Sequence, residues 1–537
     1  MYIIAIKNTY TMKDLMTRQK RIMFTFFFVL ILAATRSSAQ DNPMFRHLPP
    51  NATSVFHVNI PVITGKMNWQ ELMGSIPPGK KNPSSMDLMA VLKDPAKAGM
   101  DISRDVFFTE TRQTSPDSAV YTSFLVHLLD SAKFSAFLRN GTPGIRIVSY
   151  PGKIRSAAQG NVGVAWNKEL AVIVSVSKSM TGGSAPVNAT SFAARRSLAS
   201  LAGYDKSFYT TDPTFKAGFS DDADIQVWTE QGNGLAMLTS KFMKPTPTGS
   251  SPFATAADQQ KGKSLIAIRF EAGKITFRNH VYPTAEMAAR YAQYKSRPMD
   301  VALLARVPKG NLLGFISFSI DLLQTADAIK KYDTRHKIDS MLASKHLSLD
   351  TIMHAFKGDI QLAALEPEMD STSHKPKVPV FLVIPINDMT AFNSIAADYK
   401  SMQDSAPTDS SGQKMGFLGK MKLVSGLKNN LLVISTGQEY VDAYLGNTDT
   451  RSTDFLTEEM KRNTFNLMID FRTLADFFHH MSAQPSGKDK KMFDILDALD
   501  KLVITAGVKD GRTETYFELK LMDQGQNSLK TLVQLMH

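Results

Sequence analysis

The residues that could supply a catalytic nucleophile do not form a complete signature. Ser175-Val-Ser-Lys178 matches the Ser-x-x-Lys pattern of penicillin-binding enzymes, in which a lysine lies beside the serine nucleophile. Those enzymes place the pattern at the start of a helix, whereas here it ends a strand-like segment, and no Ser-Asp-Asn or Lys-Thr-Gly follows. The Gly-x-Ser-x-Gly elbow of α/β-hydrolases is also absent from the chain. Coincidence is the better interpretation of this motif.

Metal-ligand residue types occur, but their spacing is unfavourable. His346 and His354 are eight residues apart, and His479 and His480 are adjacent, so they would point to different sides of a helix. The run at 221–224 could offer three carboxylates to calcium, but it lacks the glycine and the distal glutamate of an EF-hand loop. Packed or surface histidines and a solvated turn are the favoured interpretations.

Carbohydrate chemistry is left open by the sequence, because the two carboxylates of a glycosidase can lie far apart in a chain. Sugar sites also favour exposed aromatic residues, and only Trp69, Trp166 and Trp228 are tryptophans. Trp166 and Trp228 fall on predicted strands and are expected in the core. We therefore assign no catalytic, cofactor-binding or metal-binding residue and no cofactor, and a non-enzymatic role is favoured.

The N-terminus is typical of a secretory leader. It has a basic stretch followed by thirteen almost uninterrupted apolar residues at 22–34, which is shorter than the roughly 20 residues that span a membrane. Ser37 and Ala39 are small residues at the positions that a signal peptidase reads, so cleavage after Ala39 is expected, with an uncleaved anchor as the alternative. No later segment approaches membrane-spanning length. The protein is expected to be exported, to the periplasm or the outer-membrane periphery of a Gram-negative bacterium.

The chain of 537 residues has no cysteine, which removes disulfides, thiolate metal sites, cysteine nucleophiles and lipid attachment at a lipobox. Its fold must therefore be held by its core alone. The formal charge is +12, of which residues 1–39 contribute +5, because they contain six basic residues and one acidic residue. The remaining basic residues are scattered, so no nucleic-acid partner is predicted.

Five segments of the first half have counterparts in the second half in the same order. The pairs are 46–60 with 306–320, 105–109 with 359–363, 124–130 with 381–387, 161–174 with 423–434, and 265–281 with 502–519. The third segment runs into a helix in each half, 131–138 and 388–399, with Asp130 and Asn387 or Asp388 as N-caps. The fourth and fifth are hairpins with turns at 167–169, 428–430, 271–273 and 509–511.

The five pairs predict an internal duplication and an α+β fold. We expect two similar lobes, each a largely antiparallel sheet with helices packed on one face. The expected boundaries are a signal peptide at 1–39, a first lobe at 40–296 and a second lobe at 297–537.

Two short motifs resemble those of a known family. Pro50-Asn-Ala-Thr-Ser-Val55 and Gly99-Met-Asp101 are similar to the opening strand and the following segment in a domain-of-unknown-function family of secreted Bacteroidetes envelope proteins. The resemblance covers essentially the whole mature chain and implies an envelope location and a two-lobed α+β fold. It implies no catalytic residue.

These observations favour a non-catalytic binding or scaffolding component whose partner is another envelope protein or an envelope polymer. A carrier or chaperone for a hydrophobic ligand is the first alternative, since 32 Phe and 28 Met could line a groove. Such residues on regular elements nevertheless most often form the core. A periplasmic hydrolase is the second alternative.

Overall fold

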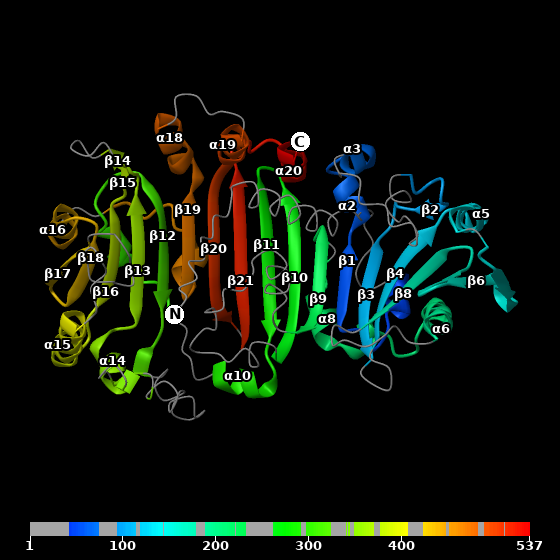
Figure 1. Ribbon diagram of the computed structural model, residues 1–537, viewed down its shortest axis with the longest axis horizontal. Coiled ribbons are helices and arrows are strands. Elements are labelled where there is room, and N and C mark those ends of the chain that lie inside the picture. Colours follow the sequence, from blue (N-terminus) through cyan, green and yellow to red (C-terminus); the bar gives the residue numbers. More distant parts are fainter. Residues whose placement is uncertain are drawn as a thin grey trace, which may run out of the picture. The chain divides into compact units, whose positions relative to one another are not determined.

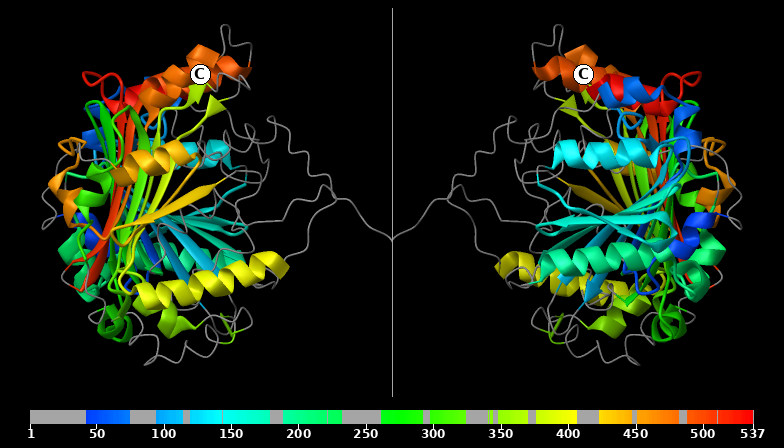
Figure 2. Two further views of the ribbon diagram at one scale, coloured as in Figure 1. Left: turned by 90° about the vertical axis from the view of Figure 1, so that its left-hand side faces the viewer. Right: turned by 90° about the vertical axis from the view of Figure 1, so that its right-hand side faces the viewer.

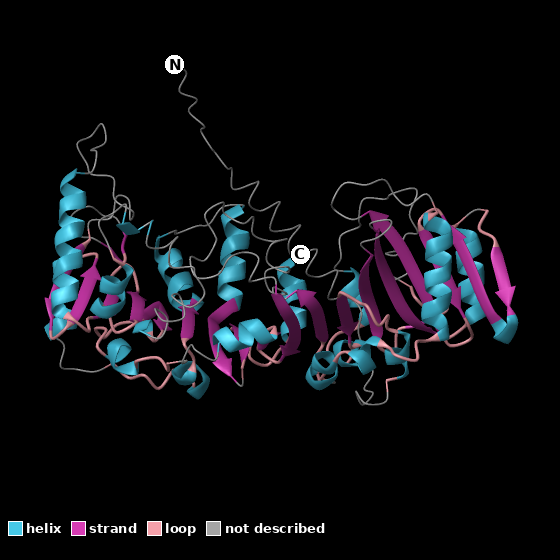
Figure 3. Ribbon diagram, turned by 90° about the horizontal axis from the view of Figure 1, so that it is seen from below, coloured by secondary structure: helices cyan, strands magenta, loops and turns pink. Residues whose placement is uncertain are grey.

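A computed structural model of the chain describes residues 42–74, 94–113, 119–142, 144–178, 188–220, 222–231, 261–291, 297–323, 340, 342–343, 348–369, 376–405, 423–446, 451–481, 488–509 and 511–536. The chain divides into two compact units. The first contains the described residues up to Glu271, together with Asn279–Tyr282 and those from Gln526 onward, and the second contains Ala272–Arg278 and Pro283–Gly525. Both units combine helices with antiparallel sheet, as the α+β prediction requires, and the strands of each unit form one layer with helices against it (Figure 3).

The first unit is built on one antiparallel sheet (Figure 1). Its strands pair in the order β10-β9-β1-β3-β4-β8-β7-β6-β5, and β2 also pairs with β4. Their bounds are β1 Ser54–Val58, β2 Met100–Asp101, β3 Val106–Gln113, β4 Ala119–Leu128, β5 Ile147–Tyr150, β6 Ile154–Gln159, β7 Val162–Trp166, β8 Leu170–Lys178, β9 Ile225–Gln231 and β10 Lys261–Glu271. The next strand, β11 (Lys274–Tyr282), has residues in both units.

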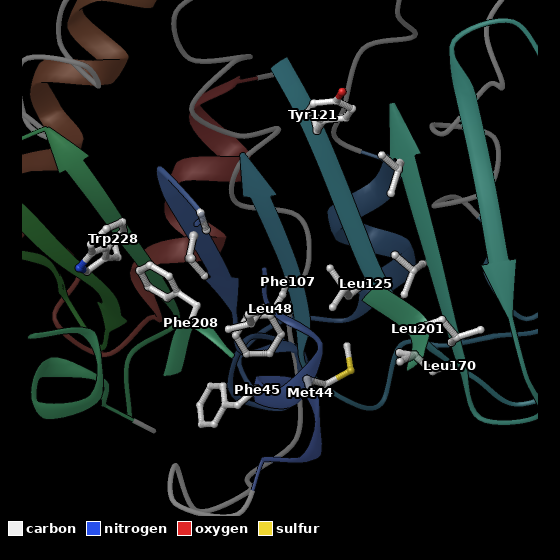
Figure 4. Packing of buried hydrophobic residues seen from close by; sticks show 14 of the residues in the cluster. Met44, Phe45, Leu48, Phe107, Tyr121, Leu125, Leu170, Leu201, Phe208 and Trp228 are labelled. Carbon is white, nitrogen blue, oxygen red and sulfur yellow. The ribbon is translucent and has the colours of Figure 1, made fainter. Parts of the chain in front are cut away.

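Helical segments of the first unit follow or separate these strands. They are η2 Pro43–His47, α2 Ile60–Thr64, α3 Trp69–Gly74, α5 Ser131–Gly141, η3 Pro151–Lys153, α6 Ala189–Ala202, α7 Phe208–Thr211, α8 Pro213–Gly218 and α20 Ser528–Met536. One core cluster packs η2, α6, α7 and α8 onto the sheet, with Phe45, Phe107, Phe208 and Trp228 among its aromatic members (Figure 4).

Helices lie against both faces of this sheet, which corrects the expectation that they pack on one face. On β7, Gly163 faces α6, because a Cβ there would lie 2.3 Å from the backbone carbon of Ala193. Trp166, three residues further along β7, lies on the opposite side of the strand. Its ring is 5.5 Å from the ring of Phe134 on α5. The right panel of Figure 2 shows α5 and α6 on either side of the strands. A sheet with apolar residues on both faces needs cover on both.

The second unit is built on another antiparallel sheet. Its strands pair in the order β21-β20-β19-β12-β13-β16-β18-β17. Their bounds are β12 Leu312–Ser319, β13 Asp359–Leu365, β16 Val380–Pro385, β17 Val424–Lys428, β18 Leu431–Ser435, β19 Phe465–Asp470, β20 Leu499–Lys509 and β21 Arg512–Leu521. A separate ribbon joins β14 Glu368–Met369 to β15 Pro376–Lys377.

The helices of the second unit are α10 Ala285–Tyr291, α11 Val301–Ala305, α14 Leu349–Ala355, α15 Met389–Ser405, α16 Gln438–Gly446, α17 Glu458–Arg462, α18 Phe471–Met481 and α19 Lys488–Ala498. Residues of α11, α16 and α17 form one core cluster with the sheet. Tyr444 of α16 is buried there and donates a 2.7 Å hydrogen bond to the Leu303 carbonyl. Burial raises the pKa of Tyr444, so this phenol is a permanent donor.

Local predictions from the sequence are confirmed at several points. Asp130 caps α5 by accepting hydrogen bonds from the backbone N–H groups of Ala132 and Lys133, and Asp388 does the same for two N–H groups at the start of α15. Asn429 and Asn430 both have positive φ between β17 and β18, as a two-residue hairpin turn requires. No helix in the described part of the chain is long and apolar enough to cross a membrane.

Candidate binding face on the second unit

Part of strands β12 and β13 has the opposite of the usual alternation between buried apolar and exposed polar residues, although Phe315, Ala363 and Leu365 on the inward side are buried in the core. Ile316 and Phe318 on β12 are each 37% exposed, and Ile360 and Leu362 on β13 are 43% and 37% exposed. The polar residues between them face inward: Ser317, Ser319, Asp359 and Gln361 are all buried. Soluble sheets normally place apolar side chains toward the core. The usual pattern is therefore inverted at 316–319 of β12 and 359–362 of β13.

The exposed residues belong to a wider apolar surface. Ile316 lies opposite Leu362 on one side and Leu467 on the other, and Phe318 lies between Ile360 and Phe465. The neighbouring strands continue this side of the sheet with half-buried Leu382, Ile384, Leu502 and Ile504. We call these ten residues the apolar face: Ile316, Phe318, Ile360, Leu362, Leu382, Ile384, Phe465, Leu467, Leu502 and Ile504. None of them carries a charge or a hydrogen-bonding side chain.

Such a surface can bind an apolar partner. Fully burying a side chain of this size is worth about 1.5–3 kcal/mol. The four most exposed residues are each about two fifths exposed, so covering them offers roughly 2–5 kcal/mol in total. Contiguous exposed apolar patches of this kind mark interaction sites. The apolar face has no group that could transfer a proton or act as a nucleophile.

Two clusters of buried ionisable residues in the first unit are structural by their geometry. Lys66 Nζ lies 2.7 and 2.6 Å from the two carboxylate oxygens of Asp224, which is completely buried and also accepts from the Phe270 N–H. Burial raises the pKa of Asp224, although Lys66 opposes the shift. Both oxygens of this carboxylate accept from protein donors, and the side chain has no exposed surface at which a substrate could bind.

The second cluster joins Asn42, His57 and Asp105. Asn42 Nδ2 donates a 2.8 Å hydrogen bond to Asp105, and His57 Nε2 lies 3.3 Å from the same carboxylate oxygen, outside hydrogen-bond geometry. The His57 ring lies 4.7 Å from the rings of Phe107 and Phe219, and it is 1% exposed. A catalytic histidine needs access to a substrate, and this one is enclosed by aromatic residues.

The motifs weighed from the sequence do not come together in the structure. Ser175 and Lys178 lie at the end of β8, as predicted, in an antiparallel pair with β4. His479 Nε2 contacts Asp497 of α19 at 2.7 Å, whereas His480 Nδ1 contacts the Asp476 carbonyl in its own helix, so the two rings point apart.

The remaining metal candidates are likewise separate or partly outside the described residues. His354 is exposed on α14, and His346 lies outside the described residues. Asp222 pairs with Arg269 at 2.7 Å while Asp224 pairs with Lys66, and Asp221 is not among the described positions. The described residues contain no cluster of three potential metal ligands.

A hollow of about 450 Å³ lies on α5, between Lys97, Lys133 and Asn140. Lys97 is well exposed and pairs with Asp94 at 2.7 Å. No buried polar group points into this hollow, so it has no built binding site. The apolar face is therefore the feature with the clearest functional meaning, and sequence reasoning missed it because β12 and β13 each look like ordinary half-buried strands.

Fold and face together define an antiparallel α+β protein with an uncharged, exposed apolar surface on a sheet of its second unit. The chain belongs to the family described as a domain of unknown function, DUF4836, which matches residues 49–425 and so covers most of the sequence. No curated protein matches the chain.

Solved structures of one other protein show a distant likeness. Crystal form IV of TP0453 has 10% sequence identity and a TM-score of 0.27, over 44% of this chain and 79% of that one. Crystal form III of TP0453 has 9% identity and a TM-score of 0.28, over 49% and 90% of the two chains. Scores this low carry no argument about fold or function.

Proposed function

We propose that this protein is an exported component of the cell envelope that binds a partner non-catalytically through the apolar face. The inverted burial of β12 and β13 is the observation that carries the proposal. A sequence that places Ile316, Phe318, Ile360 and Leu362 outward, and polar residues inward, favours a state in which that side is covered. The predicted leader and the absence of cysteine support an envelope location in a Gram-negative bacterium.

We also propose that the two units descend from an internal duplication, with a signal peptide at 1–39 and lobes at 40–296 and 297–537. The order of pairing in the two sheets supports this. Matched strands are β10 with β20, β9 with β19, β1 with β12, β3 with β13, β4 with β16, β8 with β18, and β7 with β17.

Glycines on the matched strands β7 and β17 support the same conclusion. Gly163 on β7 contacts α6, and Gly426 on β17 contacts α16, where a Cβ would lie 2.5 Å from Val441 Cγ1. In both units, therefore, the matched strand lets a helix approach closely because it has a glycine, without a side chain, at the contact.

The duplication indicates what kind of partner covers the apolar face. In the first unit, α5 covers the matching side of the sheet: Trp166 is fully buried beneath Phe134, and Leu138 of the same helix is also buried. The helix of the second unit that matches α5 is α15, yet Ile316, Phe318, Ile360 and Leu362 remain 37–43% exposed. The second unit therefore leaves apolar area open on the side of its sheet that α5 covers in the first unit. The occupant we propose is an amphipathic helix of another envelope protein.

An acyl-chain carrier is the competing function for the same surface. Such carriers enclose their ligand in a cavity that buries most of its surface, whereas the apolar face is a sheet surface with solvent-exposed side chains. The open arrangement therefore favours a protein partner. A hydrolase has less support, because no described cluster brings a nucleophile, a base and an oxyanion donor together.

An affinity pull-down tests this function. Tagged residues 40–537 would be incubated with detergent-solubilised envelopes of the host, beside a Phe318→Lys variant and a Leu129→Lys control. Leu129 is 66% exposed in the first unit, far along the chain from β12 and β13. We expect a stoichiometric protein that the wild type and the control retain and that Phe318→Lys loses.

Hydrogen exchange on the recovered complex locates the contact. Protection of β12 and β13, and of a helical segment in the partner, would support the proposal. Retention of the partner by Phe318→Lys would overturn it. Recovery of lipid in place of protein would indicate that an acyl chain, and not a partner helix, covers the apolar face. It would favour the function of an acyl-chain carrier.

A further inference from the structure

Four polar side chains cross the buried side of the second unit's sheet in a straight row. Gln361 of β13 lies directly opposite Ser317 of β12, Ser317 lies opposite Asn466 of β19, and Asn466 lies opposite Thr505 of β20. Each of the four is 3% exposed or less. We call these residues the polar row. It lies on the side of the sheet opposite to the apolar face.

Each member of the polar row has an oxygen atom without a partner among the described protein groups. These atoms are Gln361 Oε1, Ser317 Oγ, Asn466 Oδ1 and Thr505 Oγ1. The amide nitrogens of the row are used: Gln361 Nε2 donates to the Asp300 carbonyl at 2.8 Å, and Asn466 Nδ2 donates to the Asn463 carbonyl at 3.2 Å. The amide nitrogens of the row therefore have acceptors, whereas its amide oxygens and its two hydroxyl groups have no partner among the described protein groups.

Met299 and Asp300, which directly precede α11, cover part of the polar row on the side away from the sheet. Met299 is buried, and its sulfur lies 3.7 Å from Asn466 Nδ2. Asp300, the next residue, provides the carbonyl that holds Gln361. The row is thus enclosed between the sheet and residues 299–300, where bulk solvent does not reach it.

The spacing of the row suits one kind of ligand. Adjacent strands are about 4.8 Å apart, and side chains directly opposite each other have Cβ atoms about 4.5–5.5 Å apart. A molecule that makes hydrogen bonds of about 2.8 Å to two oxygens bridges up to about 5.6 Å. Water matches this distance and can donate to the amide oxygens while it exchanges hydrogen bonds with the hydroxyl groups.

We propose that the polar row is a binding site for a file of internal water molecules, which bridge Gln361 to Ser317, Ser317 to Asn466, and Asn466 to Thr505. Buried polar groups in folded proteins are satisfied by protein or by ordered water. The water file satisfies the polar groups that the inversion of β12 and β13 places inside the unit, Ser317 and Gln361, together with Asn466 of β19 and Thr505 of β20. It is thereby the inner counterpart of the apolar face and does not depend on what that face binds.

The first unit carries a related row at the matching strand positions. His57 of β1 lies opposite Gln226 of β9, and both are 1% exposed. Gln226 Oε1 has no partner among the described groups, as in the second unit. The outer neighbours of this pair are Phe107 and Ala267, so the polar part is two residues long and would hold fewer water molecules.

Replacing Thr505 by valine shifts the thermal unfolding midpoint in opposite directions, depending on whether water is bound in the polar row. Valine has the shape of threonine but no hydroxyl group. If water is bound, Thr505→Val removes one of its partners, and we expect a lower thermal unfolding midpoint. If no water is bound, the change removes an unpaired buried hydroxyl and raises the midpoint. The matched control is Thr122→Val on β4, which removes an exposed strand hydroxyl.

Oxygen-17 relaxation dispersion of the solvent counts long-lived internal water directly. The protein would be expressed with its own leader and purified after export, as wild type and as the double variant Ser317→Ala/Thr505→Val. We expect the double variant to hold fewer long-lived water molecules than the wild type. An unchanged count, or a raised unfolding midpoint for Thr505→Val, would overturn the proposal.

Discussion

Replacing Ile316 and Leu362 together by threonine tests two contributions of the apolar face separately: its contribution to partner binding and its contribution to the stability of the fold. The two residues lie directly opposite each other on β12 and β13, and each is 37% exposed. Threonine is β-branched and favours strands, so the sheet should still form. The change removes apolar area without adding a charge.

The exposed and buried fractions of these side chains set the size of the two effects. Fully burying one such side chain is worth about 1.5–3 kcal/mol, so the exposed share offers a partner about 0.5–1 kcal/mol from each residue. The pair should therefore weaken binding by about 1–2 kcal/mol, or roughly 5- to 30-fold. The larger share is already buried, and its loss should lower the free energy of unfolding by about 2–4 kcal/mol.

Two measurements check this prediction. Urea unfolding gives the loss of stability, and titration of the recovered partner gives the loss of affinity. Fluorescence of anilinonaphthalene sulfonate, which reports exposed apolar surface, should also fall below that of the wild type. Leu129→Thr is the control, since it removes a more exposed leucine in the first unit and should leave the partner affinity unchanged. Equal affinity of the double variant and the wild type would refute the assignment of the apolar face.

Two further predictions concern the first unit. Lys66→Met leaves the fully buried Asp224 without its cation and should lower the free energy of unfolding in urea by about 3–5 kcal/mol. Adding Asp224→Asn should recover part of this loss. A double variant no more stable than Lys66→Met would contradict the pairing. Burial alone would raise the pKa of Asp212, but hydrogen bonds from Lys263, Thr214 and the Phe215 N–H outweigh it and hold the pKa below 3.8. Because the pKa of Asp212 is depressed in the folded state, its carboxylate should stabilise the fold above about pH 3.8 and lose this contribution as the pH falls through the folded pKa. If the unfolding midpoint of Asp212→Asn falls as steeply in acid as that of the wild type, this contribution of Asp212 is refuted.

Local elements could be predicted well because their signals are short-range. The Asp130 cap depends on a carboxylate two and three residues before the N–H groups it accepts from. The turn at Asn429 and Asn430 depends on residue types that tolerate positive φ. Trp166 and Trp228 were expected in the core from their place in apolar strands, and both are buried.

The placement of helices and the apolar face could not be predicted in the same way. Period-2 alternation shows that a strand has two different sides, but it does not say which side the rest of the chain covers. In β13, Asp359-Ile-Gln-Leu alternates as any half-buried strand does, and the natural expectation is that Ile360 and Leu362 point inward. Gln361 is held inside by the Asp300 carbonyl, which precedes it by 61 residues. Ala363 and Leu365, on the same side of β13, are buried in the core further along the strand. These contacts and the hydrogen bond to Asp300 join residues far apart in the chain, and no local pattern encodes them.

By itself, therefore, the sequence determined the antiparallel α+β class, the order of its hairpins and caps, and the absence of cysteine chemistry, since all of these follow from residue type and near-neighbour spacing. Only the tertiary structure decided which side of β12 and β13 is buried, that the helices of the first unit cover both faces of its sheet, and that Gln361, Ser317, Asn466 and Thr505 align across four strands. Those features depend on register and on contacts between residues far apart in the chain, where one residue of shift would turn every side chain to the other face.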